Sequence, residues 1–165
     1  MINRVTSNEL KIMYSLIDEL YIAEESIPQK VFKGAVSTYV FDLEDFMDHG
    51  LKDILGLSKY ENAQNLVWLP HISVPGKTEI IELELNQNLE DFGDCLQRLW
   101  DGATLFLLLD YGCLFNDKKN WIIHFSIELQ VAVLGIFSKE IDVKSRILST
   151  PYSKETFFKR LSRIP

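Results

Sequence analysis

The stretch from Trp121 to Phe137, WIIHFSIELQVAVLGIF, decides the fold of this chain. Its two ends, 121–127 and 130–137, are rich in β-branched and aromatic residues, and Glu128-Leu129 separates them. Two apolar runs of this length around a short turn are typical of neighbouring β-strands. Together with the unbroken apolar run 103–109, we expect them to form the centre of a sheet, with 116–120 as the connecting loop.

Three other segments have the character of strands. Residues 31–41 alternate loosely among β-branched and aromatic side chains, with a β-bulge expected at Gly34, and 66–69 is a short apolar run. Residues 78–85 alternate strictly, so Glu82 and Glu84 share one face. This alternation predicts an antiparallel strand with one solvated face, because a parallel strand would be apolar on both.

Capping signals mark the helices. Thr6 and Glu9 form a capping box ahead of an amphipathic run, which predicts a helix over 7–24. Asp42 can cap a second helix that carries a buried stripe as far as Gly56, and Gly50 is a point where this helix could divide. Amphipathic spacing predicts further helices over the ranges 88–100, 138–148 and 153–163.

The order of these elements lacks the regular alternation of strands and helices that a parallel sheet requires. The expected fold class is therefore α+β: one domain over 1–165, with a mostly antiparallel or mixed sheet of about five to six strands. An N-terminal helix, one or two middle helices and C-terminal helices accompany the sheet. A chain of 165 residues is long enough to bury a core without disulfides or metals.

The apolar runs and the cysteines of the sequence indicate in which compartment of the cell to expect the protein. The longest apolar run, 103–109, is far shorter than a membrane-spanning helix, and no signal-peptide pattern opens the chain. Cys95 and Cys113 show no metal-binding spacing, so we expect two buried free thiols. These features predict a cytoplasmic protein without membrane contact.

Charge is distributed unevenly along the chain, whose net charge is −7. Residues 42–101 carry 13 carboxylates against four basic side chains, whereas the part from Lys139 onward nets +4. An acidic surface repels nucleic acid and attracts basic proteins. We therefore expect a basic protein partner and no nucleic acid, with the basic C-terminal helix as a solvated face.

The sequence contains no catalytic signature. The motifs HExxH, GxSxG, GxxxxGK[ST] and GxGxxG are absent, and none of His49, His71 and His124 has a diagnostic neighbour. We expect no enzyme activity, no cofactor and no metal. The alternative is a small-molecule-binding or hydrolytic domain with a pocket near Asp110, Tyr111 and His124, although His124 in mid-strand is more typical of a structural histidine.

One resemblance to a known family adds to this interpretation. The run Asn120 to Phe125, followed by Glu128 and then Ala132 to Gly135, resembles a pattern near the C-terminus of small bacterial toxin-immunity proteins. There a tryptophan-led strand, a short turn with an acidic residue and an apolar strand ending in glycine form a hairpin. The resemblance implies a non-enzymatic protein that binds and blocks one cognate toxin, commonly a basic nuclease, in the bacterial cytoplasm.

The leading hypothesis is thus an immunity-type protein that neutralises a cognate, basic protein toxin through an acidic surface. An interaction module within a larger assembly is a third possibility, and the sequence leaves the oligomeric state open. The carboxylates expected to contact the partner come from two helices and one strand: Asp42, Asp45, Glu82, Glu84, Asp91 and Asp94.

Overall fold

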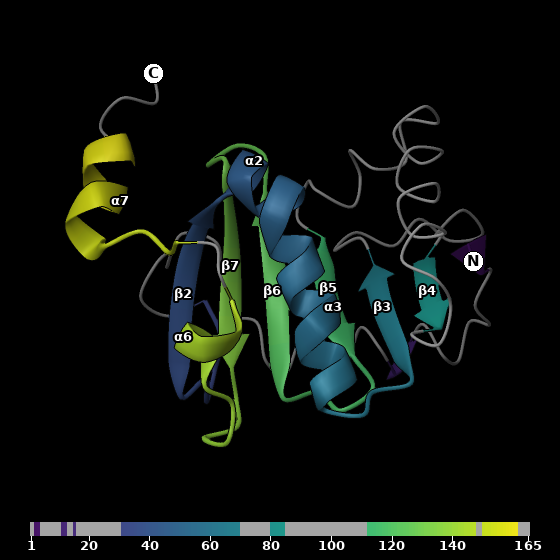
Figure 1. Ribbon diagram of the computed structural model, residues 1–165. Helices are drawn as coiled ribbons and strands as arrows, with labels where there is room; N and C mark the ends of the chain where they lie inside the picture. The colour runs from purple at the N-terminus through teal and green to yellow at the C-terminus, as the bar shows by residue number, and fades with distance from the viewer. Residues whose placement is uncertain are drawn as a thin grey trace.

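An antiparallel sheet forms the centre of the structure (Figure 1), a computed structural model that describes residues 2–3, 11–12, 15, 31–69, 80–84, 112–147 and 150–161. Within these ranges the sheet has seven strands in the order β1-β4-β3-β5-β6-β7-β2. The α+β fold class and the antiparallel sheet are therefore confirmed. The strands are β1 (Ile2–Asn3), β2 (Ser37–Asp42), β3 (Asn65–Leu69), β4 (Ile80–Glu84), β5 (Cys113–Asn116), β6 (Trp121–Ser126) and β7 (Val131–Ile136).

The predicted hairpin is formed by β6 and β7, which pair from Trp121 opposite Ile136 to Ser126 opposite Val131. The turn between them, 127–130, ends at Gln130 with a φ of 54°. The predicted polar connection before β6 is confirmed as a tight turn over 117–120. It follows β5, a strand that we did not expect, and the expected strand 103–109 lies outside the described residues.

Both faces of the central sheet are buried. One face packs against the helices drawn in front of it in Figure 1; we call its residues the first-face core, which includes Phe41, Trp68 and Phe125. The other face, the second-face core, includes Cys113, Val133 and Phe157. Every residue of β5, β6 and β7 is buried, which explains why these strands carry apolar residues at successive positions.

The helical segment after β2 is continuous from Leu43 to Tyr60. It comprises α2 (Leu43–Asp45), the π-helical turn η2 (Phe46–Gly50) and α3 (Leu51–Tyr60). The predicted cap is confirmed, because Asp42 Oδ1 accepts the N–H groups of Glu44 and Asp45 at 3.0 and 3.2 Å. Gly50 does not divide the helix; the Phe46 ring lies against it, at 2.4 Å from where a Cβ would stand.

Three boundaries differ from expectation. Gly34 stands in a turn before β2 with a φ of +73°, so it allows a left-handed turn and not a bulge. The helix predicted to end at Gly56 continues to Tyr60 because Leu57 is buried against the sheet and extends the apolar stripe. The helix expected over 138–148 is only α6 (Val143–Arg146).

Helix α6 is shorter than expected because a serine side chain competes for a main-chain N–H group in the first turn of the expected helix. Ser138 Oγ accepts the Glu140 N–H at 3.2 Å, which holds 138–140 in a non-helical turn. The last helix, α7 (Lys154–Leu161), lies within its expected range. Residues 11, 12 and 15 are helical, while the rest of the helix predicted over 7–24 and all of 88–100 lie outside the described residues.

Candidate functional site

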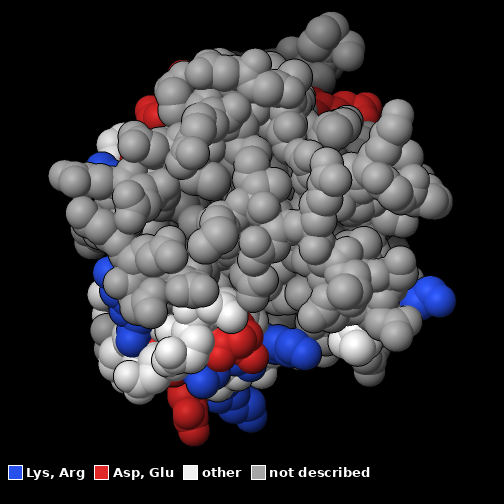
Figure 2. Space-filling view, turned by 90° about the vertical axis from the view of Figure 1, so that its right-hand side faces the viewer, with Lys and Arg blue, Asp and Glu red and all other residues white. Residues whose placement is uncertain are grey.

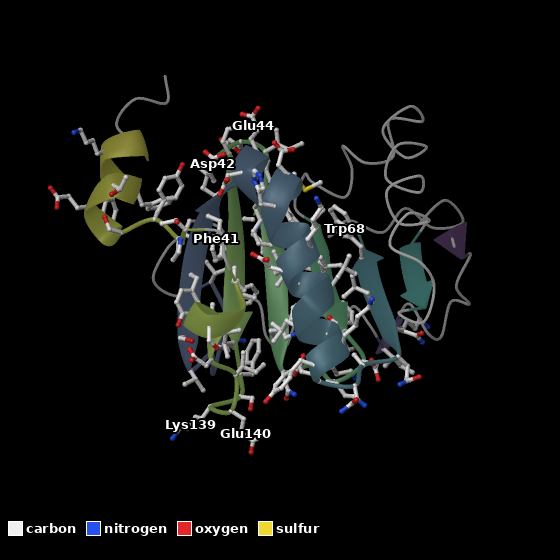
Figure 3. All side chains as sticks on the ribbon, viewed as in Figure 1. Phe41, Asp42, Glu44, Trp68, Lys139 and Glu140 are labelled. Carbon is white, nitrogen blue, oxygen red and sulfur yellow. The ribbon has the colours of Figure 1, made fainter. Side chains whose placement is uncertain are left out.

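Exposed carboxylates gather at the end of the sheet where α2 begins. The α2 and η2 turns contribute one group, and the turn between β6 and β7 contributes Glu128. The two segments meet because the Leu43 N–H donates to the Gln130 carbonyl at 3.0 Å. Figure 3 shows Asp42 and Glu44 at this end. We call this group the acidic end; it consists of Asp42, Glu44, Asp45, Asp48 and Glu128.

The five carboxylates of the acidic end have different roles. Asp42 is used internally: one oxygen caps α2 and the other accepts the Tyr152 hydroxyl at 2.8 Å. Asp45 lies 3.3 Å from His49 Nδ1, and it is exposed, as are Glu44, Asp48 and Glu128. The helix dipole stabilises acidic side chains at its first turn. Residues 42–48 and 126–131 contain no lysine or arginine.

The other predicted partner-binding residues are elsewhere. Glu82 and Glu84 lie in β4, in register with Val67 and Asn65 of β3. Five strand spacings separate β4 from β2 in the sheet order, which amounts to about 24 Å at ~4.8 Å per strand. The structure thus brings Asp42 and Asp45 together but not with Glu82 and Glu84, and Asp91 and Asp94 lie outside the described residues.

Sequence reasoning overlooked three members of the acidic end. Glu44 and Asp48 belong to the same helical segment as Asp45, and their one-turn spacing could have identified them. Glu128 could not be found this way, because its proximity to the start of α2 depends on the pairing of β2 with β7.

The opposite end of the sheet carries charges of both signs. The lower edge of Figure 2 shows basic and acidic side chains side by side, and Figure 3 places Lys139 and Glu140 at this end. Lys118 Nζ lies 3.5 Å from Asp117. Partial burial acts to raise the pKa of Asp117, but the N–H groups of Asn65 and Gln64 and the Lys118 charge together hold this pKa below its usual value.

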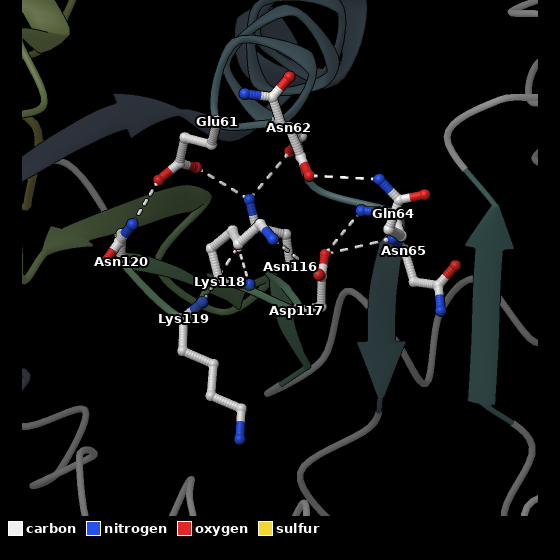
Figure 4. Close-up of polar contacts among 10 residues, drawn as sticks. Glu61, Asn62, Gln64, Asn65, Asn116, Asp117, Lys118, Lys119 and Asn120 are labelled. Carbon is white, nitrogen blue, oxygen red and sulfur yellow. Dashed lines mark hydrogen bonds and ion pairs between the residues drawn. The ribbon is translucent and has the colours of Figure 1, made fainter.

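A polar cluster joins α3 to the β5–β6 turn (Figure 4). Glu61, just past the end of α3, accepts hydrogen bonds from Asn116 Nδ2 at 2.9 Å, Asn120 Nδ2 at 2.7 Å and Trp121 Nε1 at 2.8 Å. The Asn116 side chain also accepts the main-chain N–H groups of Lys118 and Lys119 at 3.0 and 3.1 Å. The Glu61 carboxylate is occupied by donors from the turn, which is the arrangement of a structural clamp. We call Glu61, Asn116, Asn120 and Trp121 the turn clamp.

The alternative site near His124 has one described member. His124 is fully buried in β6, and its register partners are Cys113 in β5 and Val133 in β7. Asp110 and Tyr111 lie outside the described residues. The pair of His124 and Cys113 has the residue types of a nucleophilic dyad. Burial, however, raises the pKa of the Cys113 thiol to about 12, which keeps it protonated and unreactive.

No group of three or more histidine, cysteine, aspartate or glutamate side chains in the described ranges could hold a metal ion. Likewise, none of the described helices is long and apolar enough to cross a membrane.

Comparison with known proteins gives no match, whether with family models, curated proteins or solved structures. Functional inference therefore rests on the residues of this chain and their arrangement.

Proposed function

We propose that this chain is a non-enzymatic, immunity-type protein that binds and neutralises a cognate basic toxin domain in the bacterial cytoplasm. The observation that carries the proposal is the acidic end, where two segments distant in the sequence place the exposed carboxylates of Glu44, Asp45, Asp48 and Glu128. The hairpin of β6 and β7, which has the tryptophan, acidic turn and glycine described above, supports the same class of protein.

The acidic end would act mainly on the rate of association. Four exposed negative charges create a field that accelerates the approach of a basic surface, and salt weakens this field. Complementary charge also discriminates against partners with an acidic surface. Asp42 would not contribute directly, because its carboxylate caps α2 and binds Tyr152.

The test compares two acidic segments of the same chain. The partner is the product of the adjacent upstream gene, if that product carries a toxin domain, and binding is followed by stopped-flow at low and high salt. In one variant Glu44 and Asp48 are replaced by lysine; in the matched variant Glu82 and Glu84 are replaced by lysine instead, so both variants change the net charge by the same amount.

We expect the first variant to associate at least about tenfold more slowly at low salt, with a weaker dependence on salt. The second variant should associate nearly as fast as the native chain. Equal slowing in both variants would assign the effect to net charge alone, and slowing only in the second would move the binding surface to β4. Unfolding curves of both variants are the control: a curve like that of the native chain shows that slower association does not come from a loss of folding.

A further inference from the structure

Asp42 lies partly buried at the point where β2 ends and α2 begins. Its Oδ1 accepts the N–H groups of Glu44 and Asp45 at 3.0 and 3.2 Å, and N–H groups in the first turn of a helix find no acceptor within the helix itself. Glu44 and Asp45 both belong to the acidic end. The main chain that carries their carboxylates is therefore held by the Asp42 side chain.

Tyr152 binds the second oxygen of the same carboxylate. Its hydroxyl donates to Asp42 Oδ2 at 2.8 Å, across 110 residues of sequence. A hydrogen bond from a hydroxyl to a carboxylate is charge-assisted and is stronger than one between neutral groups. The terminal torsion of an aspartate side chain is broad, so a contact at each oxygen selects one orientation of the carboxylate. The cap of α2 thus depends on a donor from the C-terminal part of the chain.

Tyr152 is itself fixed to the sheet. Its main-chain N–H donates to the Val40 carbonyl at 2.7 Å, in the segment that leads into α7 (Figure 1). Its ring packs against the second-face core, with its centroid 6.3 Å from that of Phe157. Phe157 in α7 is only 1% exposed. The hydroxyl of Tyr152 is therefore presented to Asp42 by a side chain that is held at both its main chain and its ring.

We propose that Tyr152 is a positioning residue for the acidic end: through Asp42 it fixes the first turn of α2 and, with it, the carboxylates of Glu44 and Asp45. The inference rests on the proposed function, because it assigns to Tyr152 a role in binding the same partner without contact to it. A surface that is already ordered loses less conformational freedom when it binds. Tyr152 contributes no charge, so it should affect affinity without changing the salt dependence of association.

The first test is made on the chain alone. Tyr152→Phe removes only the hydroxyl, and Tyr60→Phe is the matched control, since Tyr60 is exposed at the end of α3. We expect the amides of Glu44 and Asp45 to exchange their hydrogens about three- to tenfold faster in Tyr152→Phe, as a weakened helix cap requires. The amides of β6 should keep their native rates, and the control should change neither group.

An Asp42→Ala background tests whether Tyr152 acts through Asp42. The cap is absent there, so adding Tyr152→Phe should not accelerate exchange at Glu44 and Asp45 any further. An additional acceleration in this background would overturn the proposal, as would native exchange in Tyr152→Phe alone. Equal acceleration in β6 would assign the effect to global stability and would overturn it as well.

Binding to the toxin domain encoded by the adjacent upstream gene separates this inference from the proposed function. We expect Tyr152→Phe to weaken binding about three- to tenfold, chiefly through faster dissociation, with the native salt dependence of association. Native affinity in Tyr152→Phe, alongside slow association when Glu44 and Asp48 are replaced by lysine, would refute positioning and leave the proposed function standing. If the native chain does not bind the toxin domain, the proposed function fails, and hydrogen exchange still decides whether Tyr152 orders the acidic end.

Discussion

Removal of the Glu61 carboxylate is expected to be among the most costly single changes on the described surface. The turn clamp directs three donors at this group, and two of them belong to fully buried residues, Asn116 and Trp121. A buried donor that loses its acceptor costs about 1–3 kcal/mol. Asn116 keeps a longer bond to Ser58 Oγ at 3.4 Å, which offsets part of its loss. We therefore expect Glu61→Ala to lower the free energy of unfolding by about 2–4 kcal/mol.

Urea unfolding followed by far-ultraviolet circular dichroism and by tryptophan fluorescence measures this change. Glu61→Gln retains one acceptor oxygen for the two buried donors and should cost only about 1 kcal/mol. Glu140→Ala, an exposed carboxylate at the same end of the molecule, serves as the control and should stay within about 0.5 kcal/mol of the native value. A loss below about 1 kcal/mol for Glu61→Ala, or equal losses for the alanine and glutamine variants, would refute the hydrogen-bond argument.

Three further predictions follow from buried or perturbed groups. Gly135→Ala would place a Cβ 2.3 Å from the Phe32 ring; it should cost about 1–3 kcal/mol in urea unfolding, and Phe32→Ala in the same chain should recover part of this loss. The pKa of Asp117 is lowered in the folded chain, so its charge stabilises the fold above about pH 3.8, and this contribution is lost as the pH falls further. In Asp117→Asn the free energy of unfolding should therefore depend less on pH in that range, as urea unfolding at several pH values would measure. Cys113, with a pKa of about 12, should not react with a thiol reagent at pH 8 until the chain unfolds, as measured in a Cys95→Ser background.

The sequence was informative where local chemistry decides the structure. The capping side chain of Asp42, the hairpin of β6 and β7 and the alternating strand β4 were predicted from residues close together in the chain. The solvated face of β4 stays a prediction, because the structure describes only the main chain of 80–84.

Features that depend on distant pairing were not predicted. Strand β5 has four residues, too few for a recognisable pattern, and it exists because β3 and β6 pair with it on either side. The position of β2 at the edge of the sheet has no local signal either. That position separates Asp42 from Glu82, so the acidic residues of 42–101 do not all lie on one part of the molecule.

The pairing of β2 with β7 also has a consequence for synthesis of the chain. Asp42 is paired with Val131, so about 90 residues must leave the ribosome before β2 finds its partner, which takes about 5–20 s at typical rates of translation. Contacts of such long sequence separation slow folding. During this interval the apolar side chains of β2 have no sheet to join, and we expect the nascent chain to depend on chaperones more than its size alone would suggest.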